Sequence, residues 1–168
     1  MNKLTATLLG VFVLAILTAG AFVTMGGIVN TADSIPSGVY KKVDKPLAIG
    51  KTVLFCPPDK PEFQEALKRG YIANGSCPKG YGSQMLKIAA KRKNVVSISA
   101  EGIRVDDKLL PDSKPIAQDR ENRPLPALAV GNYELKENEV VLISESPDFP
   151  YDSRYFGVVE ADQVETVI

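Results

Sequence analysis

The fold class is decided by residues 95–110, which read Val95-Val96-Ser97-Ile98-Ser99-Ala100-Glu101-Gly102-Ile103-Arg104-Val105-Asp106-Asp107-Lys108-Leu109-Leu110. Residues 95–99 and 102–105 are short runs rich in β-branched side chains, which favour strands. Asp106-Asp107 separates the second run from another apolar pair, and a two-residue polar turn between such runs is typical of a tight hairpin. This stretch therefore predicts antiparallel β structure.

The same pattern recurs on both sides of this stretch. Strand-like runs occur at residues 38–40, 52–55, 85–89 and 140–143, and 12 prolines and 13 glycines separate them. One helix is expected from Pro61, with Phe63, Ala66 and Leu67 on one face and Gly70 as its stop signal. The proline-rich residues 111–130 predict a long surface loop. We expect a mainly β fold of antiparallel sheets with a short helical insertion.

The N-terminal segment is a long uncharged run. No residue between Lys3 and Asp33 carries a charge, and residues 4–29 are almost wholly apolar or small. As a helix this run spans about 39 Å, enough to cross a bilayer of about 30 Å. We therefore interpret residues 1–29 as a membrane anchor, with a cleaved secretory signal as the alternative. Lys3 favours a cytoplasmic start, which places residues 30–168 as one domain outside the cytoplasmic membrane.

The composition excludes several function classes. Lysine plus arginine and aspartate plus glutamate both number 20, so the chain lacks the basic excess of a nucleic-acid-binding protein. It contains no histidine, which excludes Ser-His-Asp catalysis and histidine-ligated metal sites. Two cysteines cannot build a four-thiolate site, and we expect neither a metal nor another cofactor. An enzyme of this composition would need a carboxylate, an amine or a phenol as its general base.

The two cysteines suit an oxidising compartment. Cys56 and Cys77 enclose a stretch rich in proline and glycine, within a segment that we place at residues 56–83. An even pair of cysteines in an exported domain predicts a disulfide, with two buried thiols as the alternative.

Three segments carry the candidate chemistry, and they occur in a fixed order behind the anchor. They read Asn30-Thr31-Ala32-Asp33-Ser34-Ile35-Pro36-Ser37-Gly38-Val39-Tyr40, Tyr81-Gly82-Ser83-Gln84-Met85-Leu86-Lys87 and Asp152-Ser153-Arg154-Tyr155-Phe156-Gly157. Together they resemble the type I signal peptidases, and the long first segment and the cysteine pair are similar to the TraF-type conjugal-transfer peptidases of that superfamily. The resemblance covers essentially the whole chain.

This resemblance implies a serine endopeptidase with Ser34 as nucleophile, Lys87 as general base and Asp152 in support. A serine hydroxyl needs a base within hydrogen-bond reach, and lysine serves only when it is neutral, a form that burial favours. Strand alternation places Lys87 between Leu86 and Ile88, on a face shared with apolar residues. Ser37 falls at a variable position of the motif, so Ser34 is the preferred nucleophile.

Other charged residues near these segments have simpler interpretations. Lys91, Arg92 and Lys93 are typical of a solvated edge. Asp33 is typical of a turn. Asp152 and Arg154 point to the same side of an extended segment and are expected to pair.

The sequence departs from the signal-peptidase pattern at two positions. Ala32 stands where a hydroxyl residue commonly assists the oxyanion, which would then depend on backbone N–H groups, chiefly that of Ser34. Pro150 stands where a serine commonly orients the lysine, so Ser153 or Ser144 is expected to take that role.

The resemblance also implies a fold and a substrate. The fold would be a signal-peptidase-like assembly of coiled antiparallel sheets on one membrane helix, with the domain in the periplasm. The substrate would be an exported precursor, above all a conjugative pilin, cleaved after a small residue and, in some members, joined end to end. A housekeeping signal peptidase and a non-catalytic, membrane-tethered β module of a secretion channel are the alternatives.

Overall fold

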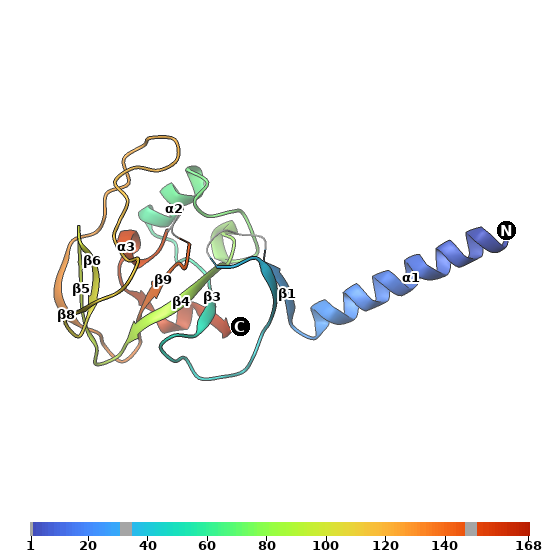
Figure 1. The fold of residues 1–168 in the computed structure, drawn as a ribbon, viewed down its shortest axis with the longest axis horizontal. Helices are drawn as coiled ribbons and strands as arrows, with labels where there is room; N and C mark the ends of the chain where they lie inside the picture. Colours follow the sequence, from blue (N-terminus) through green and yellow to red (C-terminus); the bar gives the residue numbers. More distant parts are fainter. Residues whose placement is uncertain (1, 31–34, 147–150) are drawn as a thin grey trace.

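A computed structural model describes residues 2–30, 35–146 and 151–168. Helix α1 (Lys3–Thr24) projects away from the rest of the chain (Figure 1), and it is long and apolar enough to cross a membrane. Most of its large apolar side chains are exposed, which fits either a membrane-spanning helix or a signal segment. The apolar run of residues 4–29 was considered as one helix, but α1 ends at Thr24, Gly26 adopts a φ of +81° and strand β1 follows.

The remaining elements form three antiparallel sheets, which confirms the predicted mainly β class. The first pairs β1 (Gly27–Asn30) with β2 (Gly38–Lys41). The second has the order β10 (Val159–Glu160), β9 (Glu139–Ile143), β4 (Gln84–Lys91), β3 (Thr52–Phe55) and β11 (Val164–Val167). The third has the order β7 (Lys108–Leu109), β6 (Gly102–Val105), β5 (Val95–Ser99) and β8 (Val130–Glu134).

The predicted hairpin at residues 102–110 is present. Asp106 and Asp107 both have positive φ, at 48° and 64°, and connect β6 to β7. Positive φ at both central residues is the geometry of a type I′ turn, which aspartate tolerates better than most residues.

Strand β4 lies between β3 and β9 and separates two packing faces. Leu86 and Ile88 belong to the main apolar core, whereas Met85 packs with Leu54 of β3 and with Ile35. A register shift between Ile88 and Ala90 then turns the end of β4 toward the core beneath the third sheet. The Met85 face is the one that also carries Lys87.

Residues 56–83 connect β3 to β4 and hold helix α2 (Pro61–Lys68) and the short η1 (Pro78–Gly80). The predicted disulfide between Cys56 and Cys77 is present. Helix α2 buries Phe63 in an aromatic cluster with Phe55 and Phe156. Two further short helices, α3 (Ser153–Phe156) and η2 (Ala161–Gln163), occur near the C-terminus.

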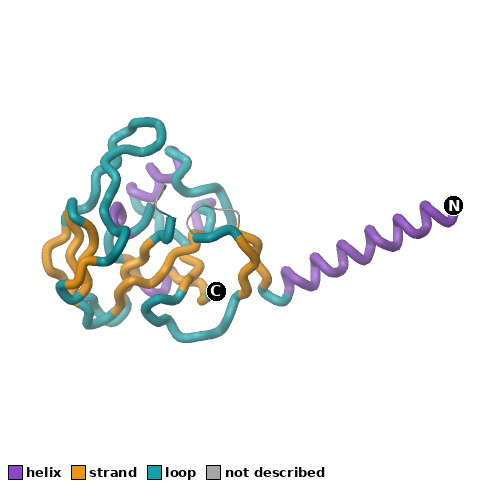
Figure 2. Tube along the Cα trace, viewed as in Figure 1, coloured by secondary structure: helices purple, strands orange, loops and turns teal. Residues whose placement is uncertain are grey.

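The long loop between β7 and β8, drawn in teal at the top of Figure 2, is held to the disulfide-bonded segment. Its buried Asp119 accepts hydrogen bonds from Tyr71 Oη at 2.6 Å and from Arg123 Nε at 2.5 Å. Burial alone raises the pKa of Asp119. The hydrogen bonds from Tyr71, the guanidinium and amide of Arg123 and the amide of Glu121 outweigh burial and hold that pKa well below its ordinary value.

Acid should therefore destabilise the wild-type chain partly through Asp119. Because its pKa is lowered in the folded state, its stabilisation is present above the ordinary value of 3.8 and is lost as the pH falls below it. Asp119→Asn should lower the melting temperature at pH 7 and give a shallower loss of stability below pH 3.8, measured by thermal unfolding against pH. Glu121→Gln, an exposed carboxylate that pairs with the same arginine, is the control and should retain the wild-type slope. Equal slopes for Asp119→Asn and wild type would contradict this role.

Candidate functional site

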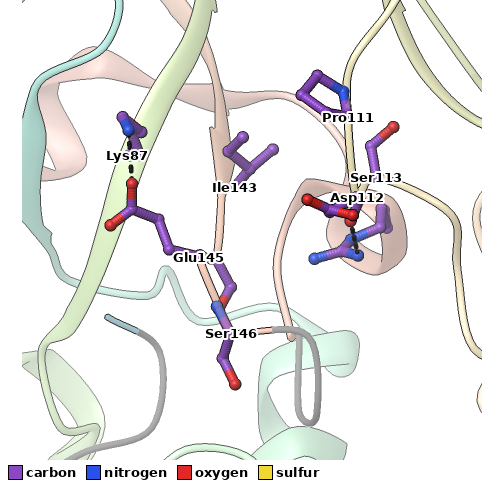
Figure 3. A pocket seen from close by; sticks show the side chains of 9 residues that line it. Lys87, Pro111, Asp112, Ser113, Ile143, Glu145 and Ser146 are labelled. Atoms are coloured by element: carbon purple, nitrogen blue, oxygen red, sulfur yellow. Dashed lines mark hydrogen bonds and ion pairs between the residues drawn. The ribbon is translucent and has the colours of Figure 1, made fainter. Parts of the chain in front are cut away.

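A cavity of about 280 Å³ lies between strand β4, the end of β9 and residues 111–113 of the long loop (Figure 3). Lys87 enters it from β4, Ile143 to Ser146 line it from β9 and the segment after it, and Arg154 lines it from α3. Pro111, Asp112 and Ser113 form the opposite wall. The cavity thus brings together groups from four separate parts of the chain.

Lys87 is half-buried and forms an ion pair at this cavity. Its Nζ lies 2.5 Å from Oε1 of Glu145, and each side chain is 35% exposed. The sheet register explains the contact. Lys87 pairs with Ile143 on β9, and Glu145 follows two residues later on the same side of the chain.

Glu145 is a partner of Lys87 that the sequence did not reveal. We expected an apolar neighbourhood for Lys87, and Met85 does share its face, but the amine itself meets a carboxylate. The only signal in the sequence is the position of Glu145 two residues beyond an apolar run. That signal has no meaning until the register of β9 against β4 is known.

Asp152 and Arg154 form the expected ion pair, and they are almost completely buried, at 0% and 2% exposure. The pairing is bidentate, with Arg154 Nε donating to Oδ1 at 2.8 Å and Nη2 donating to Oδ2 at 2.6 Å. Asp152 also caps helix α3 by accepting from the Arg154 amide. These bonds satisfy two buried charges within one turn of chain.

The same pair joins the two walls of the cavity. Asp152 Oδ2 accepts from the Ser144 amide at 2.7 Å, which fixes the segment that carries Glu145. Arg154 Nη1 donates to the carbonyl oxygens of Asp112 at 3.1 Å and Lys114 at 3.4 Å, which fixes the opposite wall. Asp152 therefore supports the position of the cavity and, in the described residues, makes no contact with Lys87.

Ser113 secures the opposite wall from the third sheet. Its buried hydroxyl accepts from the Ile103 amide at 3.0 Å and donates to the Leu110 carbonyl at 2.7 Å. Gly102 permits this contact, because a Cβ there would lie 2.5 Å from Ser113 Oγ. This close approach requires glycine at that position.

The two serines expected to orient Lys87 occupy other positions. Ser153 is fully buried, and its Oγ accepts from the Leu142 amide at 2.9 Å, so it stabilises β9. Ser144 lines the cavity, and its Oγ accepts from the Ser146 amide at 3.1 Å. In the described part of the chain, the carboxylate of Glu145 holds the amine of Lys87.

Ser34, the predicted nucleophile, lies outside the described residues, as do Thr31, Ala32, Asp33 and Pro150. Asn30 and Ile35, on either side of residues 31–34, are described, and with Pro36 and Tyr40 they form a hydrogen-bonded frame. The buried Asn30 donates through Nδ2 to the carbonyl oxygens of Ile35 at 3.1 Å and Pro36 at 3.2 Å, and Tyr40 Oη donates to the Pro36 carbonyl at 2.7 Å. Asn30 and Tyr40 thus fix the backbone of Ile35 and Pro36.

The frame is tied to the strand that carries Lys87. Ile35, which follows Ser34 in the chain, is buried against Met85, two residues before Lys87 on the same face of β4. Asn30 and Gly38 are also directly paired across the β1–β2 hairpin. Asn30 and Ile35, which precede and follow residues 31–34, are therefore both held beside β4.

The remaining charged candidates lie elsewhere. Lys91 Nζ donates to the Leu47 carbonyl at 3.3 Å, and Arg92 pairs with the exposed Glu137. Neither lines the cavity around Lys87. The disulfide borders a separate cavity, next to Glu165.

Comparison with known proteins places the chain in a family. No family model matches it. Two plasmid transfer proteins TraF of Escherichia coli are 44% identical over 154 residues (92% of this chain, 87% of the relative) and 39% identical over 168 residues (100% and 94%). The chain belongs to the TraF family. A probable conjugal transfer protein TraF of Sinorhizobium fredii is 30% identical over 135 residues, covering 79% of this chain and 70% of the relative.

Membership of the TraF family confirms the similarity to TraF-type proteins that the sequence indicated. The names of these relatives refer to plasmid and conjugal transfer rather than to a reaction.

Removal of the Asp152 charge should lower the free energy of unfolding far more than removal of the Asp112 charge at the same cavity. Asp152→Asn leaves the buried Arg154 without its counter-charge, and breaking a buried pair costs about 3–5 kcal/mol. The free energy of unfolding, from denaturant titration of the full chain in detergent, measures this loss. Asp112→Asn alters an exposed carboxylate on the opposite wall and should change stability by less than about 0.5 kcal/mol. Similar losses in both variants would contradict the supporting role of the ion pair.

Proposed function

We propose that this TraF-family chain is a membrane-bound serine endopeptidase in which Ser34 is the nucleophile and Lys87 is the general base. The observation that carries the proposal is the half-buried amine of Lys87 at an open cavity, beside a cluster that anchors Ile35, the neighbour of Ser34. The absence of histidine from the sequence leaves lysine as a suitable base for a serine hydroxyl.

The reaction would proceed through an acyl-enzyme. The neutral amine of Lys87 takes the proton from Ser34 Oγ as that oxygen bonds to the substrate carbonyl carbon, and the carbonyl electron pair moves to its oxygen. The intermediate collapses as the peptide C–N bond breaks, and the Lys87 ammonium gives its proton to the leaving amine. Because Ala32 offers no hydroxyl, backbone N–H groups would stabilise the oxyanion.

A second nucleophile would then release the product. Lys87 removes a proton from water as the new C–O bond forms and the ester bond to Ser34 breaks, and Ser34 recovers its proton. An amino terminus of the substrate could replace water and would yield a new peptide bond in a ring. Both outcomes use the same acyl-enzyme.

The relatives' names support conjugal transfer as the process that this chain serves. With α1 as an anchor in the cytoplasmic membrane, the catalytic domain would face the periplasm, where the disulfide is stable. The substrate would be an exported precursor, most directly the pilin of the conjugation apparatus, cleaved after a small residue. A broad housekeeping peptidase would mature other exported proteins as well, and a non-catalytic β module would process none.

Substitution of the proposed dyad tests the function. Ser34→Ala and Lys87→Ala should each abolish processing of the pilin precursor, a loss of at least about 1,000-fold, because each removes a group that the covalent step requires. Immunoblots of precursor and mature pilin in a transfer-competent strain measure the effect. The controls are Ser37→Ala, an exposed serine three residues away, and Lys91→Ala on the same strand as Lys87.

The controls also decide between the alternatives. Processing that survives both dyad substitutions would contradict the peptidase mechanism and favour the scaffold. Loss of processing in Ser37→Ala but not in Ser34→Ala would show that Ser37, rather than Ser34, is the nucleophile. Loss of maturation of unrelated exported proteins in Ser34→Ala would favour the housekeeping peptidase.

A further inference from the structure

The β1–β2 hairpin has an inner face and an outer face of different surroundings. Strand alternation places Ile28 and Tyr40 on the inner face, where they pack against the cluster that contains Met85 of β4. The outer face carries Val29 and Val39, which are directly paired across the hairpin and are 63% and 69% exposed. The hairpin thus presents an apolar pair on the face that the core does not cover.

This outer face is turned toward helix α1. Gly27 shares the face with Val29, because alternate residues of a strand point to the same side. A Cβ at Gly27 would lie 2.3 Å from Cζ of Phe22, so the ring of Phe22, from the last turn of α1, lies directly over this position. Figures 1 and 2 show the hairpin between α1 and the other sheets. The apolar outer face is therefore continuous with the end of the helix.

Basic residues accompany the apolar pair. Lys41 is paired with Gly27 and therefore lies on the outer face, level with the end of α1. Lys42 follows it, with its Nζ 4.0 Å from the carboxylate of Glu165, and both lysines are exposed. Residues 41–45 carry three lysines and one aspartate. Lysines in this position, next to a membrane segment, are attracted by the negative surface potential of anionic lipids.

We propose that the outer face of the hairpin is a membrane-contact surface, which lies in the headgroup region of the leaflet from which α1 emerges. Val29 and Val39 enter the boundary of the acyl chains, while Lys41 and Lys42 meet anionic headgroups. The bilayer is the occupant because the same face adjoins Phe22 of a helix long and apolar enough to span it. A small apolar area is sufficient, since α1 tethers the hairpin and makes the contact intramolecular. The inference depends on α1 as an anchor and not on the peptidase reaction.

This contact would fix the orientation of the domain on the membrane. A helix end alone lets a domain tilt, whereas a second contact, through a hairpin that packs on β4, selects one orientation. The same hairpin holds the backbone of Ile35 and Pro36 through Asn30 and Tyr40. Contact of the outer face with lipid would therefore keep this frame next to the bilayer surface.

Tryptophan fluorescence tests the contact without reference to activity, because the chain contains no tryptophan of its own. Full-length Val39→Trp is reconstituted into vesicles of phosphatidylcholine and phosphatidylglycerol, a fraction of whose acyl chains are brominated. Val23→Trp, within α1, is the positive control. Leu109→Trp, at an exposed site in the third sheet, which lies far from α1 in Figure 1, is the negative control. Val39→Trp should be quenched several-fold more strongly than Leu109→Trp.

The controls make each outcome decisive. Quenching of Val39→Trp as weak as that of Leu109→Trp, with Val23→Trp strongly quenched, would overturn the contact. Blue-shifted but unquenched emission from Val39→Trp would assign the face to a second copy or another protein and would also overturn it. Val29→Trp repeats the measurement at the paired position, and melting temperatures identify any variant that is not folded.

Lipid charge tests the part of the lysines. Quenching of Val39→Trp should fall several-fold in vesicles of phosphatidylcholine alone. In the mixed vesicles, adding Lys41→Gln to Val39→Trp should lower the quenching, whereas adding Lys108→Gln, in the third sheet, should leave it unchanged. Quenching that is the same with and without phosphatidylglycerol, and with and without Lys41, would overturn the role of the lysines.

Discussion

The structure depends on one buried ion pair. Asp152 and Arg154 are both excluded from solvent, and their charges are stable there only because each is matched by the other and by backbone partners. Those partners belong to the two walls of the cavity, at Ser144 on one side and at Asp112 and Lys114 on the other. The pair thus links the end of the central sheet to the long loop, and the cavity exists where these two parts meet.

The proposed chemistry uses Lys87, a charged group that takes no part in the buried ion pair. The buried pair is fully occupied by structural bonds, whereas Lys87 is half-exposed and its carboxylate partner lies on a segment outside the ladder. Ile35, the residue after Ser34, packs against Met85 of β4, the strand that carries Lys87. The proposed serine–lysine mechanism requires a fixed nucleophile and an amine within its reach in a chain without histidine.

Local patterns in the sequence predicted much of the fold. The runs at 52–55 and 95–99, helix α2 from Pro61, the Asp106-Asp107 turn and the disulfide all depend on neighbouring residues or on composition, and all are present. The strand β8 was missed because it contains Gly131 and Asn132, which disfavour strands. Helix α1 ends at Thr24 although apolar residues continue into β1, so hydropathy alone does not locate its end. Glu145 and the Asp119–Tyr71 contact depend on sheet register and on loop docking, which link residues far apart in the chain.

The central claim is that Ser34 becomes covalently attached to substrate with Lys87 as its base. Its most direct measurement is rapid acid quenching of the full-length protein with a precursor peptide, followed by mass spectrometric mapping of the modified residue. We expect an ester on Ser34 that carries the amino-terminal part of the peptide and does not form in Lys87→Ala. An adduct on Ser37, or cleavage that proceeds equally well in Ser34→Ala, would contradict it.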